Sequence, residues 1–322
     1  MSSSYSGGKS HQKGAMRDDT DITQFLEGLT IDQSECLHAG SDGVCISKKV
    51  LPAVAAIAQL QVGELPAADI VAAATKVLGC GSESCVISHT RTQEAARALN
   101  IASDLSHELT HKFKPPGPRN STALLSNVHI DNVLKLWAEE FPDFYACPFA
   151  MADFNTNGDH FATVKLEELR EGKCRTFGCV MNTDNSRGPG THWVAVFVDM
   201  RPEAEDNMPW TIEYFNSAGR PPAAPVVRWM EQTRAKLTVA RAKLLTLQAR
   251  SNVSGATAGP VETWAVSSVS HQQSQTECGP YALYYIRRRL EGARPKDFMD
   301  ALYRIPDRAM VEFRHYLFRE RK

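Results

Sequence analysis

The sequence predicts an α+β fold, in which a helical N-terminal arm precedes a domain that contains a sheet. Three observations lead to this prediction. From about residue 22 to residue 111 the apolar residues have helical spacing, as in KVLPAVAAIAQL and PAADIVAAATKVLG. The segment HKFKPPGPRNST then interrupts the pattern with three prolines and a glycine. Beyond it, strands occur in runs with helices grouped around them, which favours α+β over repeating βαβ units.

We therefore divide the chain into a tail at 1–20, a helical arm domain at 21–115 and a second domain at 116–322. The tail is rich in Ser, Gly and Lys, a composition typical of disorder. It lacks the hydrophobic stretch of a secretory signal, and no apolar run in the sequence is long enough to span a bilayer. We expect no membrane association.

The second domain alternates between helical and strand patterns. SNVHIDNVLKLWAEEFP predicts an amphipathic helix that Pro142 ends. TFGCVMNT predicts a short strand, and HWVAVFVDM has the continuous apolar character of a strand covered on both faces. WTIEYFNS and VETWAVSSVS predict two more strands, separated by a long helical stretch at 222–250.

Charge and cysteine usage exclude some classes of protein. The net charge of −1 argues against a dedicated nucleic-acid binder. Eight cysteines without a signal peptide indicate a reducing compartment, where we expect free thiols. The pairs Cys36/Cys45, Cys80/Cys85 and Cys174/Cys179 lack a histidine pair at zinc-ligand spacing, so we expect small buried side chains and no metal. We also expect no organic cofactor.

Cys278 is the first candidate functional residue, in the stretch ECGPYALYYIRRRLEG. Pro280 fits the first position of a helix, because its fixed φ is already helical, and Gly292 fits the end. Cys278 then lies at the positive N-terminal end of that helix, where the pKa of a thiol is lowered and the nucleophilic thiolate is favoured.

A nucleophilic cysteine needs a histidine to move its proton. His192 is the preferred candidate, because it opens the buried strand HWVAVFVDM just after the loop NSRGPG. The alternatives His271, His160 and His129 lie in less constrained settings.

Two further roles have competing candidates. Asn216 follows the strand WTIEYF and could orient the imidazole, as in Cys-His-Asn enzymes, with Asp199 as its rival. Gln272 precedes the cysteine and could stabilise an oxyanion together with the cysteine N–H, with Gln273 and Gln275 as its rivals. Spacing alone does not choose among the three glutamines.

These residues, in this order, resemble a known family. THWVAVFVD, IEYFNSAG and QQSQTECGPYALYYI resemble the ubiquitin-like-protein proteases and the adenovirus proteinase, which have a papain-like cysteine protease fold. The resemblance implies a thiol endopeptidase, with Gln272 as oxyanion donor and Asn216 in preference to Asp199. It implies that Trp193 lines a narrow channel and that cleavage follows small residues, in a Gly-Gly-X sequence. Glu277 stands where that family has an acidic residue before the cysteine.

Other segments resemble the proteases of large nucleocytoplasmic DNA viruses, among them KVLGCGSESCVI and LLSNVHIDNVLKLWAEEFPDFYACPFAMADF. Those enzymes process virion polyproteins and carry a helical arm before the catalytic domain. The resemblance implies a monomer that acts on viral structural polyprotein precursors, in the host cytoplasm, viral factory and virion. A protein from another source would be cytoplasmic or nuclear.

Three alternatives remain at this point. A protease that deconjugates a ubiquitin-like modifier differs only in its substrate. Bacterial effector acetyltransferases share the same layout but form an acyl-cysteine, and their third residue is normally acidic, which disfavours them here. A silent binding module for a ubiquitin-like protein would have no reason to keep Cys278, His192 and Gln272 together.

Overall fold

The computed structural model describes residues 21–29, 35–37, 43–63, 65–120, 122–203, 207–249 and 258–319. The strands are β1 (Phe144–Ala146), β2 (Ala150–Met151), β3 (Thr176–Asn182), β4 (Trp193–Asp199), β5 (Trp210–Phe215) and β6 (Val261–Val266). The helices before the sheet are α1 (Thr23–Leu26), α2 (Leu51–Ala58), α3 (Ala67–Leu78), α4 (Glu83–Ser88), α5 (Thr90–Ala98), α6 (Ala102–His111) and α7 (Asn127–Glu140). The later helices are α8 (His160–Thr163), α9 (Leu166–Gly172), α10 (Ala224–Ala249), α11 (Cys278–Leu290), α12 (Asp307–Leu317) and the 3-10 turns η1 (Pro295–Phe298) and η2 (Ala301–Tyr303). Over the described residues, no helix combines the length and apolar character needed to cross a bilayer.

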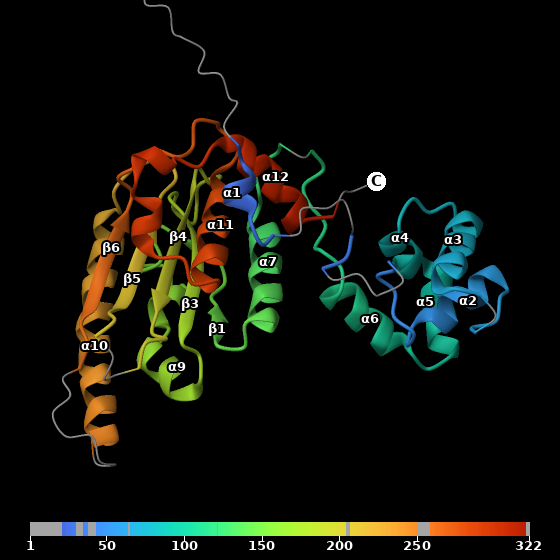
Figure 1. The fold of residues 1–322 in the computed structure, drawn as a ribbon, viewed down its shortest axis with the longest axis horizontal. Helices are drawn as coiled ribbons and strands as arrows, with labels where there is room; N and C mark the ends of the chain where they lie inside the picture. Colours follow the sequence, from blue (N-terminus) through green and yellow to red (C-terminus); the bar gives the residue numbers. More distant parts are fainter. Residues whose placement is uncertain are drawn as a thin grey trace, which may run out of the picture.

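A mixed sheet forms the centre of the second domain, with strands in the order β1-β3-β4-β5-β6 and β2 also paired with β3 (Figure 1). β3, β4 and β5 are antiparallel neighbours, whereas β6 runs parallel to β5. Every residue of β3, β4 and β5 is buried. The apolar run in HWVAVFVDM therefore did mark a strand covered on both faces, and the α+β fold class is confirmed.

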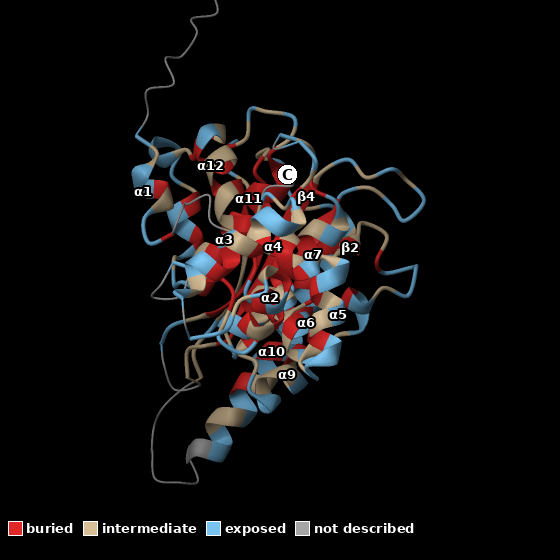
Figure 2. Cartoon of the chain, turned by 90° about the vertical axis from the view of Figure 1, so that its right-hand side faces the viewer, coloured by how far each residue is buried: buried red, intermediate tan, exposed pale blue. Residues whose placement is uncertain are grey.

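Two apolar layers cover the two faces of the sheet. The buried side chains of α7, α11 and α12 form one core with Ala195 and Phe197 of β4. The buried side chains of α10 form the other core with Val194, Val196 and Val198 of the same strand. The second half of α10 extends past the sheet, and most of its described residues are exposed or half-buried (Figure 2). Leu237 and Arg241 in this half are buried. The alternation along β4 thus places α11 and α10 on opposite faces, as period-2 geometry requires.

The arm has an apolar core of its own. Buried side chains from α2 to α6 pack together, and these helices stand to one side of the sheet domain (Figure 1). α1 behaves differently, because Phe25 belongs to the core around α11 and its carbonyl accepts a hydrogen bond from Tyr284 at 2.6 Å. The division at 21–115 and 116–322 stays a prediction, and the proposed disordered tail at 1–20 lies outside the described residues.

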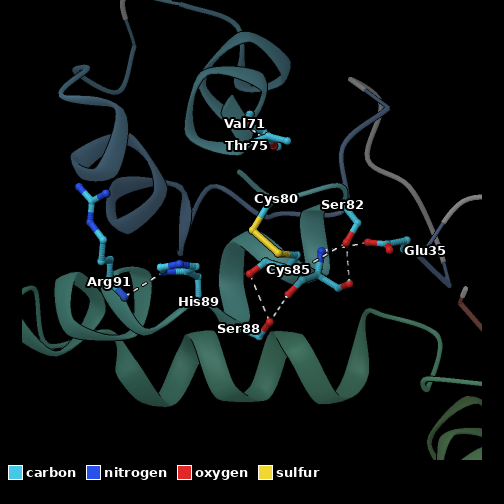
Figure 3. The surroundings of a disulfide bond; sticks show 10 residues. Glu35, Val71, Thr75, Cys80, Ser82, Cys85, Ser88, His89 and Arg91 are labelled. Carbon is cyan, nitrogen blue, oxygen red and sulfur yellow. Dashed lines mark hydrogen bonds between the residues drawn. A yellow bond between two sulfur atoms is a disulfide. The ribbon is translucent and has the colours of Figure 1, made fainter. Parts of the chain in front are cut away.

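Two disulfides stabilise the arm, so the expectation of free thiols was wrong for four of the cysteines. Cys36 is bonded to Cys45 and Cys80 to Cys85, with Cα–Cα distances of 5.4 and 5.6 Å. The second bond links the residues before α4 to the helix itself (Figure 3). The remaining four cysteines, Cys147, Cys174, Cys179 and Cys278, are free.

Candidate active site

A cavity of about 290 Å³ contains the two residues that the sequence places at the centre of the chemistry, His192 and Cys278. Trp193 and the loop 188–191 form one wall, and residues 124–127 form another, with Phe149 and Met151 nearby. No residue of α10 appears among the described residues that line it. The long helical stretch after Asn216 therefore lies away from this cleft.

Cys278 is the first residue of α11, two positions earlier than the helix start expected from Pro280. Its side chain is only 2% exposed, yet it faces the cavity. The next residue, Gly279, lies against Leu125, whose side-chain atoms would be 3.0 Å from a Cβ at that position. A side chain after the cysteine would crowd Leu125, so a glycine suits the close packing of the start of α11 against the cavity wall.

The pKa of Cys278 differs from the expectation at a helix N-terminus. Burial raises the pKa of the thiol above its ordinary value, and the neighbouring Glu277 carboxylate acts in the same direction. The backbone N–H groups of Trp193, Gly279 and Cys278 itself lower it, but by less. The expected lowering was wrong, because removal from water outweighs the N–H donors at the helix end. The free protein therefore holds a protonated thiol at neutral pH.

His192 precedes β4, and its carbonyl accepts a hydrogen bond from the N–H of Thr183 at 2.8 Å. Its Nε2 lies 2.9 Å from Oδ1 of Asn216, immediately after β5. That oxygen also accepts from the N–H of Ala218 at 2.9 Å, while the amide nitrogen of Asn216 donates to the hydroxyl of Tyr214 at 3.0 Å. Because Oδ1 can only accept, Nε2 carries the ring proton and Nδ1 is left as the basic nitrogen.

Burial also shifts the pKa of the His192 imidazole. It lowers the pKa of His192, and the positive charge of Arg220 lowers it further, while the hydrogen bond to Asn216 raises it. The net direction is downward, so the ring is neutral at neutral pH. A neutral imidazole and a protonated thiol that line the same cavity suit general-base activation rather than a preformed ion pair.

The alternatives to Asn216 and His192 are bonded to other groups in the structure. Asp199 lies at the far end of β4 from His192, and its carboxylate pairs with Arg201 at 2.6 Å and Arg289 at 3.1 Å. Both ring nitrogens of His271 are hydrogen-bonded to the backbone, at Phe298 O and Ile305 N. His160 is bonded to the hydroxyl of Tyr145 and His129 to the cap residue Ser126. The structure thus brings Asn216, and not Asp199, to His192.

Gln272 lies beside the site but does not line the cavity. Its side-chain oxygen accepts from Ser217 Oγ at 2.9 Å, and its amide nitrogen donates to Ser274 O at 2.9 Å. Its backbone N–H donates to Ser217 O, so the residue is held next to the segment that follows Asn216. The amide of Gln273 donates to the carbonyls of Ser270 and Gln272 instead.

Trp193 is 8% exposed and forms part of the cavity wall. Its indole N–H donates to Leu125 O at 2.9 Å, and its ring meets Phe149 edge-on with centroids 6.3 Å apart. These contacts fix the ring plane. The indole therefore has a fixed place in the wall of the cavity that contains Cys278.

Sequence reasoning missed Asn182, which ends β3 and lines the cavity. Its Oδ1 accepts from the N–H groups of Asp184 at 3.0 Å and Thr191 at 3.1 Å, which closes the loop before His192. Gly190 in that loop has φ +84°, a conformation that favours glycine. The glycine-rich loop NSRGPG is visible in the sequence, but no local signal there shows that the end of β3 holds it.

The site combines a cysteine at a helix N-terminus with a histidine that lines the same cleft and that an asparagine orients. This is the arrangement of Cys-His-Asn hydrolases. Comparison with known proteins agrees with this class. The family described as "Ulp1 protease family, C-terminal catalytic domain" matches residues 179–322. The chain belongs to the Ulp1-type cysteine protease family and is a cysteine-type peptidase, as the similarity to curated relatives over nearly the whole chain shows.

The relatives are viral proteins. A cysteine protease of African swine fever virus (isolate Tick/Malawi/Lil 20-1/1983) is 42% identical over 309 residues, which is 92% of this chain and 98% of the relative. A putative thiol protease of Acanthamoeba polyphaga mimivirus is 22% identical over 214 residues, covering 66% of this chain and 62% of the relative. The solved crystal structure of an African swine fever virus protease superposes with a TM-score of 0.70 at 38% identity, covering 92% of this chain and 99% of that one.

Proposed function

We propose that this peptidase is an endopeptidase that cleaves viral structural polyprotein precursors after small residues, in Gly-Gly-X sequences. The catalytic part of this proposal rests on one observation: His192 and Cys278 line the same cleft, and the Nε2 atom of His192 lies 2.9 Å from Oδ1 of Asn216. The viral origin of the relatives supports the choice of substrate class.

In the proposed mechanism the Sγ atom of Cys278 attacks the carbonyl carbon of the scissile bond. His192 Nδ1 takes the thiol proton as the C–S bond forms and gives it to the leaving amine as the C–N bond breaks. A water molecule then loses a proton to the same nitrogen and attacks the thioester, which releases the new carboxyl terminus and restores the thiol. Asn216 keeps the ring in the tautomer that leaves Nδ1 basic.

The oxyanion of each tetrahedral intermediate would be stabilised by the N–H of Cys278 and by the amide of Gln272. In the free protein one N–H of that amide donates to Ser274 O, which leaves the second N–H of the same group to donate to the oxyanion. Removing one such donor costs about 100-fold to 1,000-fold in kcat in comparable enzymes.

Trp193 is proposed to select small residues on the acyl side of the scissile bond. The cavity in front of Cys278 is small, and its walls include the indole together with Leu125 and Phe149. Glycine places no side chain against these walls. We infer that the enzyme acts as a monomer in the host cytoplasm, viral factory and virion, on a polypeptide substrate, without a metal or organic cofactor.

Deconjugation of a ubiquitin-like modifier is the second candidate function. A relative from African swine fever virus that is 42% identical to this chain carries the description "SUMO-1 cysteine protease" in its name. Both functions use the same site and a Gly-Gly sequence, and they differ in whether the bond lies in a linear chain or joins a modifier to a lysine.

Profiling with a peptide library tests the proposal, with Cys278→Ala as the control. We expect cleavage after Gly-Gly and none by the variant. A SUMO conjugate and labelled acetyl-coenzyme A serve as the other substrates. Cleavage of the conjugate alone would favour deconjugation, stable acetylation of Cys278 would favour acyl transfer, and full activity of Cys278→Ala would refute the assignment of the site.

A further inference from the structure

Helix α12, which lies after all the catalytic candidates in the sequence, contacts the segment that leads into Cys278. Asp307, its first residue, accepts hydrogen bonds from the N–H groups of Ser274 at 2.8 Å and Gln273 at 3.1 Å. The hydroxyl of Tyr281 lies 3.1 Å from the same carboxylate and shares its single proton with Ile305 O at 2.9 Å. Tyr281 belongs to α11, three residues after the cysteine. Asp307 therefore joins the loop before Cys278 to the helix that begins with it.

Arg314 makes a second connection, two turns further along α12. Its Nε donates to the carboxylate of Glu277 at 2.8 Å, and one terminal nitrogen donates to Thr276 O at 2.9 Å. The other terminal nitrogen donates to Ala123 O at 2.9 Å, just before the residues that form the cavity wall. Arg314 and Glu277 are 4% and 2% exposed. The guanidinium thus fixes the cysteine loop against the wall of the cleft.

These contacts matter because the loop 272–277 connects the two proposed oxyanion donors, the amide of Gln272 and the N–H of Cys278. Such donors act only when they lie about 2.7–3.1 Å from the oxyanion. A displacement of ~1 Å can cost about a hundredfold in rate. The loop has no regular secondary structure of its own, so its shape depends on the residues that hold it.

Charge gives Arg314 a second effect. Glu277 is the acidic group next to Cys278, and its negative charge raises the pKa of the thiol. Arg314 pairs with that carboxylate and offsets its charge. His192 shares the cavity with Cys278 and also titrates, and the positive charge of Arg220 acts on its imidazole. Loss of Arg314 would leave a buried carboxylate unpaired beside the nucleophile.

We propose that Asp307 and Arg314 are positioning residues for the peptidase reaction, which hold the loop 272–277 in the geometry that oxyanion stabilisation requires. The inference rests on the proposed role of Cys278 as the nucleophile. Neither side chain lines the cavity in front of Cys278. Both act through the backbone and the carboxylate to which they are bonded.

The test compares Arg314→Met, Arg314→Lys and Asp307→Asn with the wild-type chain on a Gly-Gly-X peptide. We expect kcat to fall by about a hundredfold in Arg314→Met and Asp307→Asn, with KM changed less than about threefold. Arg314→Lys restores part of kcat, because lysine can reach Glu277 but cannot supply the three separate donors. Arg308→Met, an exposed arginine on the same helix, is the matched control and keeps wild-type kinetics.

A second readout does not depend on peptide cleavage. The rate of Cys278 alkylation by iodoacetamide is followed against pH, and its midpoint moves to higher pH in Arg314→Met. The double variant Glu277→Gln/Arg314→Met removes both charges, so it folds without a buried unpaired charge and its midpoint returns to that of the wild type. Its kcat stays low, because the bonds to Thr276 O and Ala123 O are still absent.

Circular dichroism establishes which variants are folded. If Arg314→Met does not fold, the double variant Glu277→Gln/Arg314→Met replaces it in the kinetic comparison. Wild-type kcat in folded Asp307→Asn and in the double variant would overturn the proposal. An unchanged alkylation midpoint in folded Arg314→Met would overturn its electrostatic part. Activity that survives Cys278→Ala would instead count against the proposed function itself, so the two failures are distinguishable.

Discussion

The Nε2 atom of His192 lies 2.9 Å from Oδ1 of Asn216, and this contact fixes which ring nitrogen is basic. The amide oxygen is identified independently, because it also accepts a hydrogen bond from the N–H of Ala218. Asn216 itself is 2% exposed, so the ring is held by a group that water does not reach freely. The contact supports an orienting role for Asn216 without a negative charge beside the imidazole.

Replacing Asn216 with Ala should lower kcat for a Gly-Gly-X peptide by about tenfold to a hundredfold, because the ring can then turn away or change its tautomer. Steady-state kinetics measure the loss. Asp199→Asn is the control. It weakens the ion pairs with Arg201 and Arg289 and should reduce the free energy of unfolding by ~2 kcal/mol, with kcat nearly unchanged. The reverse pattern would make Asp199 the functional residue.

The pH dependence of kcat/KM should show a broad plateau through neutral pH. The pKa of His192 is lowered, so the base is lost only below its ordinary value of about 6.5. The pKa of Cys278 is raised, so the thiol deprotonates only above its ordinary value of about 8.5. Activity that falls as the pH drops from 8 to about 7 would contradict these directions.

The numbers of free and disulfide-bonded cysteines can be counted chemically. Iodoacetamide added to the denatured protein should label four cysteines without reductant and all eight after reduction, because Cys36–Cys45 and Cys80–Cys85 are disulfides. Intact mass spectrometry reads the number of labels. Eight labels before reduction, in protein prepared without reductant, would mean that the arm holds free thiols.

The proposed specificity predicts a cut in the chain itself. Gly7-Gly8 is the only pair of adjacent glycines in the sequence, followed by Lys9, and it lies outside the described residues. Incubation of the purified protein should release residues 1–8 and expose a new N-terminus at Lys9, as read by intact mass. Gly8→Val should stay whole while it still cleaves an external peptide. A wild-type chain that stays whole while it cleaves Gly-Gly-X peptides would show that this pair is not a substrate.

Much of the sheet domain could be predicted from periodicity, because its central elements are buried in regular patterns. β4 was recognisable from an unbroken apolar run, and α7 from a stripe that includes Ile130, Leu134 and Trp137, all of them buried. β1 and β2 have three and two residues, too few for a period to show. They exist because β3 offers them a partner, which is a tertiary effect.

The site was predictable in its residue types but not in its environment. His192 and Cys278 could be chosen by their positions at the start of a strand and of a helix. The resemblance favoured Asn216 over Asp199, and the register of β4 and β5 gives the physical reason: Asn216 follows the end of β5 that lies beside the start of β4, whereas Asp199 lies at the other end of β4. The direction of the thiol pKa needed the extent of burial, and the contacts of Asp307 and Arg314 join segments 33, 37 and 191 residues apart. None of these is a local property of the sequence.

The central claim is that Cys278, activated by His192, is the nucleophile. A peptide that ends in Gly-Gly-vinyl sulfone tests it most directly, because the probe forms a stable thioether with an attacking cysteine. Peptide mapping by mass spectrometry should find one adduct, on Cys278, formed at least about a hundredfold more slowly in His192→Ala. An adduct on Cys147, Cys174 or Cys179 instead, or an undiminished rate in His192→Ala, would contradict the account.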